Sequence, residues 1–475
     1  MAITKAKVGE VEVGTAPIER FQPLLGQEAW TEFHAAMEAF AGALRGRRVW
    51  NVNSTARGGG VAELLASLIP YARGCGIDER WVVIEGSPDF FDVTKKIHTL
   101  LHGVVSDSAA FTDTERSQYE ETLAKNDAAL VAMIAPGDVA FLQDPQTAGL
   151  IPSLKARGAR VIWRSHVGID EPNDAARLAW RFLLPYVTQA HAYVFSRQAH
   201  VWEGLDRSRV HIIPPCIDPF APKNVDLDLR ARDAILHASG LVDGPGGDAV
   251  FARPDGSRGR VARAATTRVP RLPQDARIVL QVSRWDRLKD PMGVMDAYLN
   301  HIGPRVDSWL VLAGPSPSSV RDDPEQPEII RELIERRKEL PEPVCRRIVL
   351  AELPMQDADE NAAIVNALQR RADVVVQKSV AEGFGLTVAE AMWKARPVVA
   401  SRVGGIEDQI EDGQSGVLVD DPRDVKQVGD AVVNLLRDPD RAAKLGERAR
   451  RRVIQRFIAP RHLTDEAAAV KAVLG

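Results

Sequence analysis

Short apolar segments of strand length alternate with helical apolar periodicity along most of the chain. In the first helical segment, residues 64, 65, 68 and 69 form one apolar stripe. Such alternation is typical of βαβ units. The predicted strands form two series: 48–53, 81–85, 138–142, 160–164, 192–196 and 210–213, then 277–283, 309–313, 347–350, 373–377, 397–401 and 416–419. The pattern predicts an α/β protein with two Rossmann-like, doubly wound parallel-sheet domains that face each other across a ligand cleft.

Breaks in this pattern divide the chain into segments. We expect an N-terminal arm, a first domain, a hinge with an insertion, a second domain and a C-terminal helix that crosses back to the first domain. Their bounds are 1–47, 48–216, 217–274, 275–455 and 456–475. Residues 239–273 are rich in Gly, Pro and Arg and lack a periodic apolar face, which predicts a flexible surface insertion. A site for an anionic partner is the alternative interpretation of these arginines.

Composition and charge narrow the class of protein. The chain has 475 residues, 45% of them apolar and 27% charged, which is typical of globular proteins with more than one core. The net charge of −4 argues against a nucleic-acid partner. No apolar run approaches the ~20 residues of a membrane span, and the N-terminus lacks a signal-like layout. Three widely spaced cysteines fit a reducing compartment, so we expect a cytoplasmic protein.

Four segments fall at predicted strand-to-helix junctions, where ligands of such sheets bind. The first runs from Asn53 to Gly58-Gly59-Gly60, before a predicted helix. Its glycines allow a close backbone approach, and the N–H groups of the helix start favour an anion, although a tight turn without a ligand is the alternative. Another is His166, which follows strand 160–164. A single histidine is usually structural, but this position makes it a candidate cleft residue.

The third junction carries two cations. Arg284 and Lys289 follow the strand at 277–283, and Asp290-Pro291 fits the N-cap and first residue of a helix. A planar guanidinium and a compact ammonium are suited to a diphosphate. Solvated surface charge is the alternative.

The fourth junction combines acids with glycines. Residues 382–385, Glu-Gly-Phe-Gly, follow the strand at 373–377, and Glu390 comes in the next helix. Glu382 lies in a glycine-rich turn after a buried strand, a position suited to binding hydroxyl groups. Thr387 and Glu390 also match a capping box, so a purely structural role is the alternative for the second acid.

Two Asp-x-Asp pairs resemble metal–nucleotide ligands but are discounted. Asp226 and Asp228 lie in a polar run after the hinge, and Asp357 and Asp359 lie at a predicted helix start. No His/Cys cluster has the spacing of a zinc site. We therefore expect no metal site.

In this order, the four segments resemble the retaining glycosyltransferases of family 4, which have the GT-B fold of two Rossmann-like domains. The first half is similar to the trehalose-forming members. The supporting segments are 51–55, 58–63, 81–86, 93–95, 144–146, 163–166 and 217–219, then 284–289, 382–390, 397–401, 403–406 and 412–416. The resemblance covers residues 48–235 and 275–473. The chain departs from the family at Lys289-Asp290, where Lys-Gly is frequent, and at the two residues after His166, which affects the loop beside the acceptor.

The resemblance implies a role for each candidate residue. Arg284 and Lys289 would neutralise the leaving diphosphate, and Glu382 would bind hydroxyls of the donor sugar. Glu390 would bind the ribose, and His166 would contact the transferred sugar. The other donor-site residues would be Gly59, Gly60, Gly383, Phe384 and Gly385, and the acceptor site would include Asn53, Asp144 and Gln146.

The reaction that the resemblance implies joins UDP-, ADP- or GDP-glucose to glucose, giving α,α-trehalose and a nucleoside diphosphate. This reaction requires no cofactor. The partners implied for the protein are small-molecule substrates, and the protein assembly that we include among the expectations is a homodimer. A retaining trehalose phosphorylase, or a family 4 enzyme with another acceptor, is the alternative. A nicotinamide dehydrogenase is disfavoured because neither half has G-x-G-x-x-G after its first strand. A non-catalytic nucleotide-sugar sensor is disfavoured by the intact cations and acids.

Overall fold

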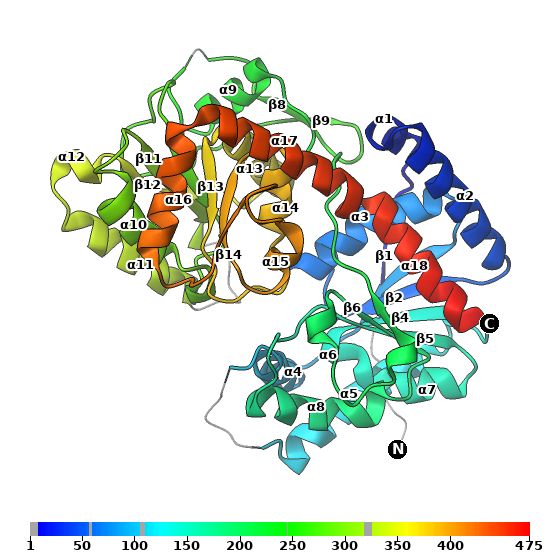
Figure 1. The fold of residues 1–475 in the computed structure, drawn as a ribbon. Coiled ribbons are helices and arrows are strands. Elements are labelled where there is room, and N and C mark those ends of the chain that lie inside the picture. Colours follow the sequence, from blue (N-terminus) through cyan, green and yellow to red (C-terminus); the bar gives the residue numbers. More distant parts are fainter. Residues whose placement is uncertain (1–7, 57–58, 105–109, 245, 318–324) are drawn as a thin grey trace. The chain divides into compact units, whose positions relative to one another are not determined.

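The computed structural model describes residues 8–56, 59–104, 110–244, 246–317 and 325–475. These residues form two compact units, each built on its own sheet (Figure 1). The first unit contains the chain up to Cys216 together with Phe457–Gly475, and the second is Ile217–Arg456. Each unit has its own apolar core. The predicted α/β architecture with two parallel sheets is therefore confirmed.

The sheet of the first unit has the strand order β1-β3-β2-β4-β5-β6-β7. Its strands are β1 Gly9–Val11, β2 Val49–Asn53, β3 Glu79–Val83, β4 Val139–Gln143, β5 Arg160–Ser165, β6 Ala192–Phe195 and β7 Val210–Ile212. Only the β1–β3 pair is antiparallel. From β2 the chain passes to β3 on one side, and then to β4 on the other side. The direction of winding therefore reverses between β2 and β4.

The main helices of the first unit contact one another in two groups: α4 contacts α5 and α8, and α18 contacts α2 and α3. They are α1 Gln22–Leu25, α2 Gln27–Ala43, α3 Gly60–Gly74, α4 Pro88–Leu101, α5 Asp113–Leu130, α6 Asp144–Thr147, α7 Ile151–Ala156, α8 Asp174–Val187 and α18 Ala459–Leu474, with 3-10 turns η1 Ile18–Phe21, η2 Ala148–Leu150, η3 Gln198–His200 and η4 Arg207–Arg209. The described part of the expected N-terminal arm is not separate. It supplies β1, which pairs with β3, and α2, which packs against α18.

The sheet of the second unit is wholly parallel, with the order β12-β11-β10-β13-β14-β15. Its strands are β10 Ile278–Val282, β11 Trp309–Pro315, β12 Ile348–Leu353, β13 Val374–Gln377, β14 Val398–Ser401 and β15 Val417–Val419. The helices are α9 Leu229–Ala238, α10 Pro291–Ala297, α11 Glu325–Lys338, α12 Glu342–Cys345, α13 Ala358–Arg371, α14 Leu386–Trp393, α15 Gly405–Gln409, α16 Val425–Arg437 and α17 Pro439–Arg456, with the 3-10 turn η5 Arg287–Lys289 and the π-helical turn η6 Tyr298–Ile302. This is the Rossmann strand order, and winding reverses between β10 and β13.

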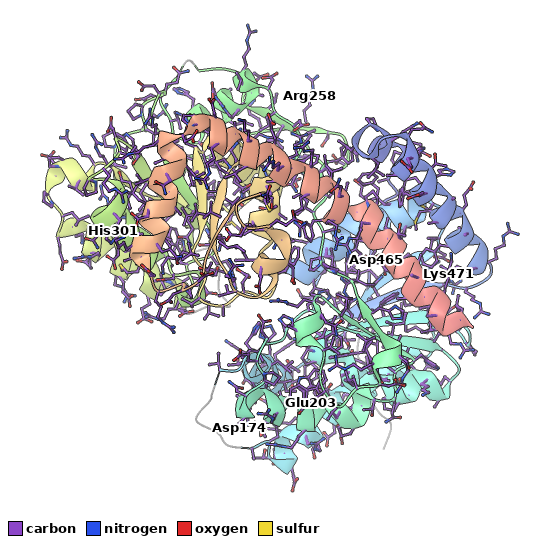
Figure 2. All side chains as sticks on the ribbon, in the orientation of Figure 1. Asp174, Glu203, Arg258, His301, Asp465 and Lys471 are labelled. Carbon is purple, nitrogen blue, oxygen red and sulfur yellow. The ribbon has the colours of Figure 1, made fainter. Side chains whose placement is uncertain are left out.

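The expectation that residues 239–273 form a flexible insertion is wrong. The segment contains an antiparallel hairpin, β8 Val250–Ala252 with β9 Arg258–Arg260, and some of its arginines pair with acids of the second unit. The pairs are Arg253 with Asp357 and Asp359, and Arg263 with Glu360 of α13. Two backbone hydrogen bonds link Thr266 to Glu352 of β12. Other arginines, such as Arg258, stay exposed (Figure 2). Long-range ion pairs thus supply the order that the segment's composition does not predict.

Candidate active site

The reversals of winding place the sequence-predicted residues at strand ends. Where two crossovers leave a sheet in opposite directions, the carboxyl ends of the two central strands border a crevice suited to ligands. In the second unit, β10 leads to Lys289 and β13 leads to Glu382. In the first unit, β2 leads to Asn53, and β4 leads to Asp144. The predicted residues thus gather at two places, one in each unit.

Lys289 and Glu382 form an ion pair in the second unit. Lys289 Nζ lies 2.5 Å from Glu382 Oε2, and Ser379 Oγ donates to the same oxygen over 3.2 Å. The two side chains are only 18% and 11% exposed, so little solvent screens their attraction. This pair brings together a cation suited to a phosphate and an acid whose other oxygen is suited to sugar hydroxyls.

The turn after Lys289 is strained. Asp290 adopts a left-handed conformation with φ 46°, a state that costs a non-glycine residue about 1–3 kcal/mol. Its Oδ1 accepts the N–H of Gly293 over 2.9 Å, which confirms the predicted N-cap of α10, and its Oδ2 pairs with Lys378. Arg284 is different: its side chain is 61% exposed and lies 3.3 Å from Asp286. The structure therefore fixes Lys289 more firmly than Arg284.

The loop at 383–385 is shaped by a second pair of glycines. A Cβ on Gly404 would lie 1.7 Å from the carbonyl oxygen of Glu382, so no other residue fits there. The N–H of Gly405 donates to Gly383 O over 3.1 Å. No acceptor among the described residues takes the N–H groups of Gly383 and Gly385. At the start of α14, these amides are suited to an anion or a sugar oxygen.

The predicted capping box at α14 is wrong. The N-cap is Gly385, in a left-handed conformation with φ 84°, and it has no side chain to cap with. Thr387 Oγ1 instead donates to Gln377 Oε1 over 3.1 Å. Glu390 is 4% exposed and lies 3.6 Å from Lys223 Nζ. The capping alternative for Glu390 is therefore wrong, and its ribose role stays a prediction beside the ion pair with Lys223.

In the first unit, Asp144 and His166 are in contact. The N–H of His166 donates to Asp144 Oδ1 over 2.8 Å, and Asp144 is a second left-handed residue, with φ 63°. Burial raises the pKa of Asp144 to about 7, against an opposing effect of this hydrogen bond. Burial, followed by the charge of Arg164, lowers the pKa of His166 well below its usual range. The lowered pKa favours the neutral form of the His166 imidazole.

The other predicted residues of the first unit have varied surroundings. Asn53 is 4% exposed, and its side chain accepts from Trp81 Nε1 and donates to the Thr55 carbonyl. Gly59 has φ 89° and precedes Gly60, the first residue of α3, while Gly58 lies outside the described residues. Gln146 is half-buried on α6, and Phe384 is buried in the second unit. Asn53 thus shapes its turn rather than offering free polar atoms.

Sequence reasoning missed two polar residues at the strand ends, Gln143 and Lys378. Gln143 Oε1 lies 2.8 Å from His166 Nε2, and Lys378 pairs with Asp290. Gln143 is 2% exposed, and Lys378 is 1% exposed. Each is a polar residue directly after an apolar run of strand length, and this pattern would have identified it as a candidate site residue.

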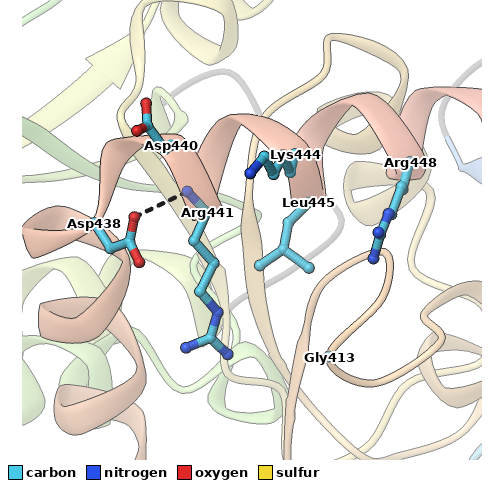
Figure 3. Close-up of a pocket in the computed structure, with 7 residues that line it drawn as sticks. All are labelled: Gly413, Asp438, Asp440, Arg441, Lys444, Leu445 and Arg448. Carbon is cyan, nitrogen blue, oxygen red and sulfur yellow. Dashed lines mark hydrogen bonds between the residues drawn. The ribbon is translucent and has the colours of Figure 1, made fainter.

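Away from these strand ends, a pocket of ≈ 250 Å³ lies beside α17. Figure 3 shows the residues that line it. It is lined by Gly413, Asp438, Asp440, Arg441, Lys444, Leu445 and Arg448, none of which is a predicted site residue.

The described residues contain no group of three or more His, Cys, Asp or Glu that would hold a metal ion. None of the helices in the described part of the chain is both long enough and apolar enough to span a membrane. The two discounted Asp-x-Asp pairs have structural partners: Asp228 caps α9 and Asp357 caps α13.

Comparison with known proteins is consistent with this geometry. Residues 51–202 match the family described as trehalose synthase, N-terminal domain, and residues 263–452 match glycosyl transferases group 1. A trehalose synthase from Rubrobacter xylanophilus is 36% identical over 94% of this chain and 95% of its own length. A trehalose phosphorylase from Pleurotus sajor-caju is 29% identical over 84% of this chain and 54% of its own length.

The solved structure of an α,α-trehalose-phosphate synthase (UDP-forming) from Burkholderia vietnamiensis shares the fold. It superposes with a TM-score of 0.64 at 15% identity, covering 90% of this chain and 99% of that chain. Two Rossmann-like sheets with candidate residues at their reversal points are the architecture of a GT-B glycosyltransferase. Within that class, the chain belongs to the trehalose synthase family, whose members it matches at 36% and 34% identity over nearly their whole length. It is therefore a trehalose-related glycosyltransferase.

Proposed function

We propose that the protein is a retaining glucosyltransferase that forms α,α-trehalose and a nucleoside diphosphate from NDP-glucose and glucose. The observation that carries the proposal is the shielded Lys289–Glu382 pair beside the amides of Gly383 and Gly385. It combines a cation suited to a phosphate, an acceptor of sugar hydroxyls and N–H donors at the strand ends of one sheet. Membership of the trehalose synthase family supports a trehalose product.

The proposed chemistry places these groups at the leaving diphosphate. When the bond from the glucose C1 to the phosphate oxygen breaks, C1 becomes oxocarbenium-like, and negative charge grows on the diphosphate. Lys289, Arg284 and the two amides oppose that charge, a contribution of several kcal/mol to lowering the barrier. The anomeric hydroxyl of the acceptor attacks C1 from the face that the diphosphate leaves, and its proton passes to the leaving phosphate oxygen. The configuration at C1 is thereby retained.

The remaining residues bind and orient the substrates in this proposal. Glu382 accepts hydrogen bonds from the donor sugar, and Glu390 accepts them from the ribose. His166 is neutral, so it is suited to accept or donate a hydrogen bond to a sugar hydroxyl without adding charge. Lys289 and Arg284 supply positive charge and the amides supply hydrogen-bond donors, so we expect activity to persist in excess EDTA. A loss that magnesium restores would contradict metal independence.

The test is an incubation of the protein with glucose and each of UDP-, ADP- and GDP-glucose. NMR of the anomeric protons should reveal the α,α-linkage of trehalose, and release of the nucleoside diphosphate should match it in amount. The rival activity, suggested by the similarity to a trehalose phosphorylase, is tested with trehalose and inorganic phosphate. Formation of glucose 1-phosphate without any reaction of the nucleotide sugars would overturn the proposal.

A further inference from the structure

A row of buried side chains runs from His166 into the interior of the first unit. His166 Nε2 lies 2.8 Å from Gln143 Oε1, and Gln143 Nε2 donates to Asn51 Oδ1 over 2.9 Å. Asn51 Nδ2 then donates to Glu79 Oε1 over 2.6 Å. The three residues beyond His166 are 1–3% exposed. The row thus links a candidate substrate residue to a carboxyl group three strands away.

The sheet order explains how the row forms. Glu79, Asn51 and Gln143 belong to β3, β2 and β4, which are neighbours in the sheet. Residues of adjacent strands that point to the same face lie within hydrogen-bonding reach. On β2, Trp50 and Val52 enter the main apolar core, so Asn51 lies on the opposite face. Buried amides on that face require partners, and they find one another.

The direction of these hydrogen bonds follows from the orientation of the Asn51 amide. Asn51 turns its NH₂ group toward Glu79, where Oε1 accepts, and its oxygen toward Gln143. Gln143 must then donate to Asn51, which leaves its own oxygen facing the imidazole. A carbonyl oxygen only accepts, so His166 Nε2 carries the hydrogen. The other ring nitrogen, Nδ1, therefore carries a lone pair, and no described residue donates to it.

We propose that Gln143, oriented through Asn51 by Glu79, is a positioning residue that fixes His166 as the Nε2–H tautomer, so that Nδ1 accepts a hydrogen bond from a substrate hydroxyl. The role in transfer rests on the function proposed above, whereas the tautomer does not. An oriented neutral ring can accept a hydroxyl hydrogen in only one direction, which favours one placement of the sugar. In this role His166 does more than contact the sugar, because its Nδ1 accepts a hydrogen bond from a hydroxyl in one fixed direction.

Several charged groups surround this row. They are Arg73 on α3, Asp144 at the start of α6, Arg164 on β5, and His462 and Glu466 on α18. Arg164 donates to His462 Nε2 over 3.0 Å, and burial raises the pKa of both Glu79 and Glu466. These groups matter for the test below, because a carboxylate introduced at position 143 would interact electrostatically with each of them.

The first measurement reads the tautomer directly in the free protein. Long-range ¹H–¹⁵N spectra of protein with ¹⁵N-labelled histidine, assigned by difference with His166→Phe, should show His166 protonated at Nε2. An Nδ1–H signal would mean that the row runs in the opposite direction, and it would overturn the proposal. This readout does not depend on the reaction that the protein catalyses.

The second measurement uses Gln143→Glu, which keeps an acceptor for Nε2–H and adds a negative charge. The charge should raise the pKa of His166, so that Nδ1 becomes protonated near neutral pH. Turnover of the variant should then fall on the acidic side and recover as the pH rises, in step with the ring's titration by NMR. A ring titration that moves while the pH profile of turnover stays fixed would overturn the acceptor role of Nδ1.

Gln143→Met removes the acceptor with little change in volume. It should lower kcat about tenfold to a hundredfold, the range for residues that orient a functional histidine, with a smaller change in KM. Asn126→Ala is the matched control, because Asn126 is a fully buried amide of the same unit outside the row. If this control lowers kcat as much as Gln143→Met, the effect is general destabilisation, and the positioning role fails. If the wild type proves inactive but shows Nε2–H, the tautomer stands and the proposed function falls.

Discussion

Lys289 and its neighbour Arg287 allow a matched comparison of two cations from one turn. Lys289 is shielded and pairs with Glu382, whereas Arg287 is 53% exposed and pairs with Glu328 and Glu332 of α11. Lys289→Ala should lower turnover about 10²-fold or more, because a donor at the leaving group is lost. Arg287→Ala should leave turnover within about twofold, since exposed ion pairs contribute little. Steady-state kinetics of both variants checks this, and similar rates for the two would place the diphosphate elsewhere.

Glu390 is a second residue whose proposed role a single substitution tests. It is buried beside Lys223 but caps no helix, because Gly385 holds the N-cap position of α14. Glu390→Gln should therefore weaken binding of the nucleoside diphosphate by about tenfold, the loss of a charge-assisted hydrogen bond. Calorimetric titration measures this. An unchanged affinity, with unfolding unaffected, would leave the carboxylate without a role in the nucleotide site.

At the scale of single elements, the turn before α15 supports the loop at 383–385. Gly404→Ala should destabilise the second unit by more than about 1–2 kcal/mol and lower turnover, because the new Cβ collides with the Glu382 carbonyl. Gly413→Ala is the control: Gly413 also has a positive φ, 69°, but a Cβ added there would have nothing within 4 Å. Chemical denaturation and kinetics separate the two effects. Equal losses in both variants would show that only backbone strain is involved.

The segment at 239–273 behaves as part of the second unit because Glu360 anchors it. Glu360 is 1% exposed, pairs with Arg263 and accepts the backbone N–H groups of Ala262 and Arg263. Glu360→Ala should lower the free energy of unfolding by about 1–3 kcal/mol, because two backbone N–H groups and the Arg263 guanidinium lose their common acceptor. Asp248→Ala breaks the exposed Asp248–Arg260 pair of the same segment and should cost less than about 1 kcal/mol. If urea denaturation finds equal small losses, the docking does not contribute to stability.

For the molecule as a whole, buried acids of the first unit make stability depend on pH. Burial raises the pKa of Glu466 to about 7, above the value of an exposed glutamate in the unfolded chain. The folded state then binds more protons than the unfolded state between those two values, so this contribution to stability falls as the pH rises through that window and is constant above it. Asp144 acts with the same sign.

Glu466→Gln removes that contribution. Between pH 5 and pH 8, the variant should lose less stability than the wild type, while the shared contributions of His166 and His462 cancel in the difference. Urea denaturation across this range measures it, with Glu32→Gln, at an exposed position of α2, as the control. Parallel pH dependences of the wild type and Glu466→Gln would mean that Glu466 is already ionised in the folded protein.

Much of the fold was predictable because its signals are local. Alternation of apolar runs with helical stripes predicts parallel sheets, and the Asp290-Pro291 start of α10 follows from N-cap chemistry. The candidate residues were also local signals, since Arg284, Lys289, Glu382 and His166 each follow an apolar strand run. A residue's place after a strand is set by the few residues around it.

The tertiary structure alone decided which residues meet. The Glu79–Asn51–Gln143 row depends on β2 lying between β3 and β4, an order that no stretch of sequence encodes by itself. The docking of residues 239–273 depends on pairs nearly 100 positions apart. By contrast, the sequence determined by itself that the chain has two sheets with charged and glycine-rich strand ends. Periodicity and turn chemistry act between neighbours in the chain, whereas hydrogen-bond partners of buried polar groups are chosen by strand order and packing.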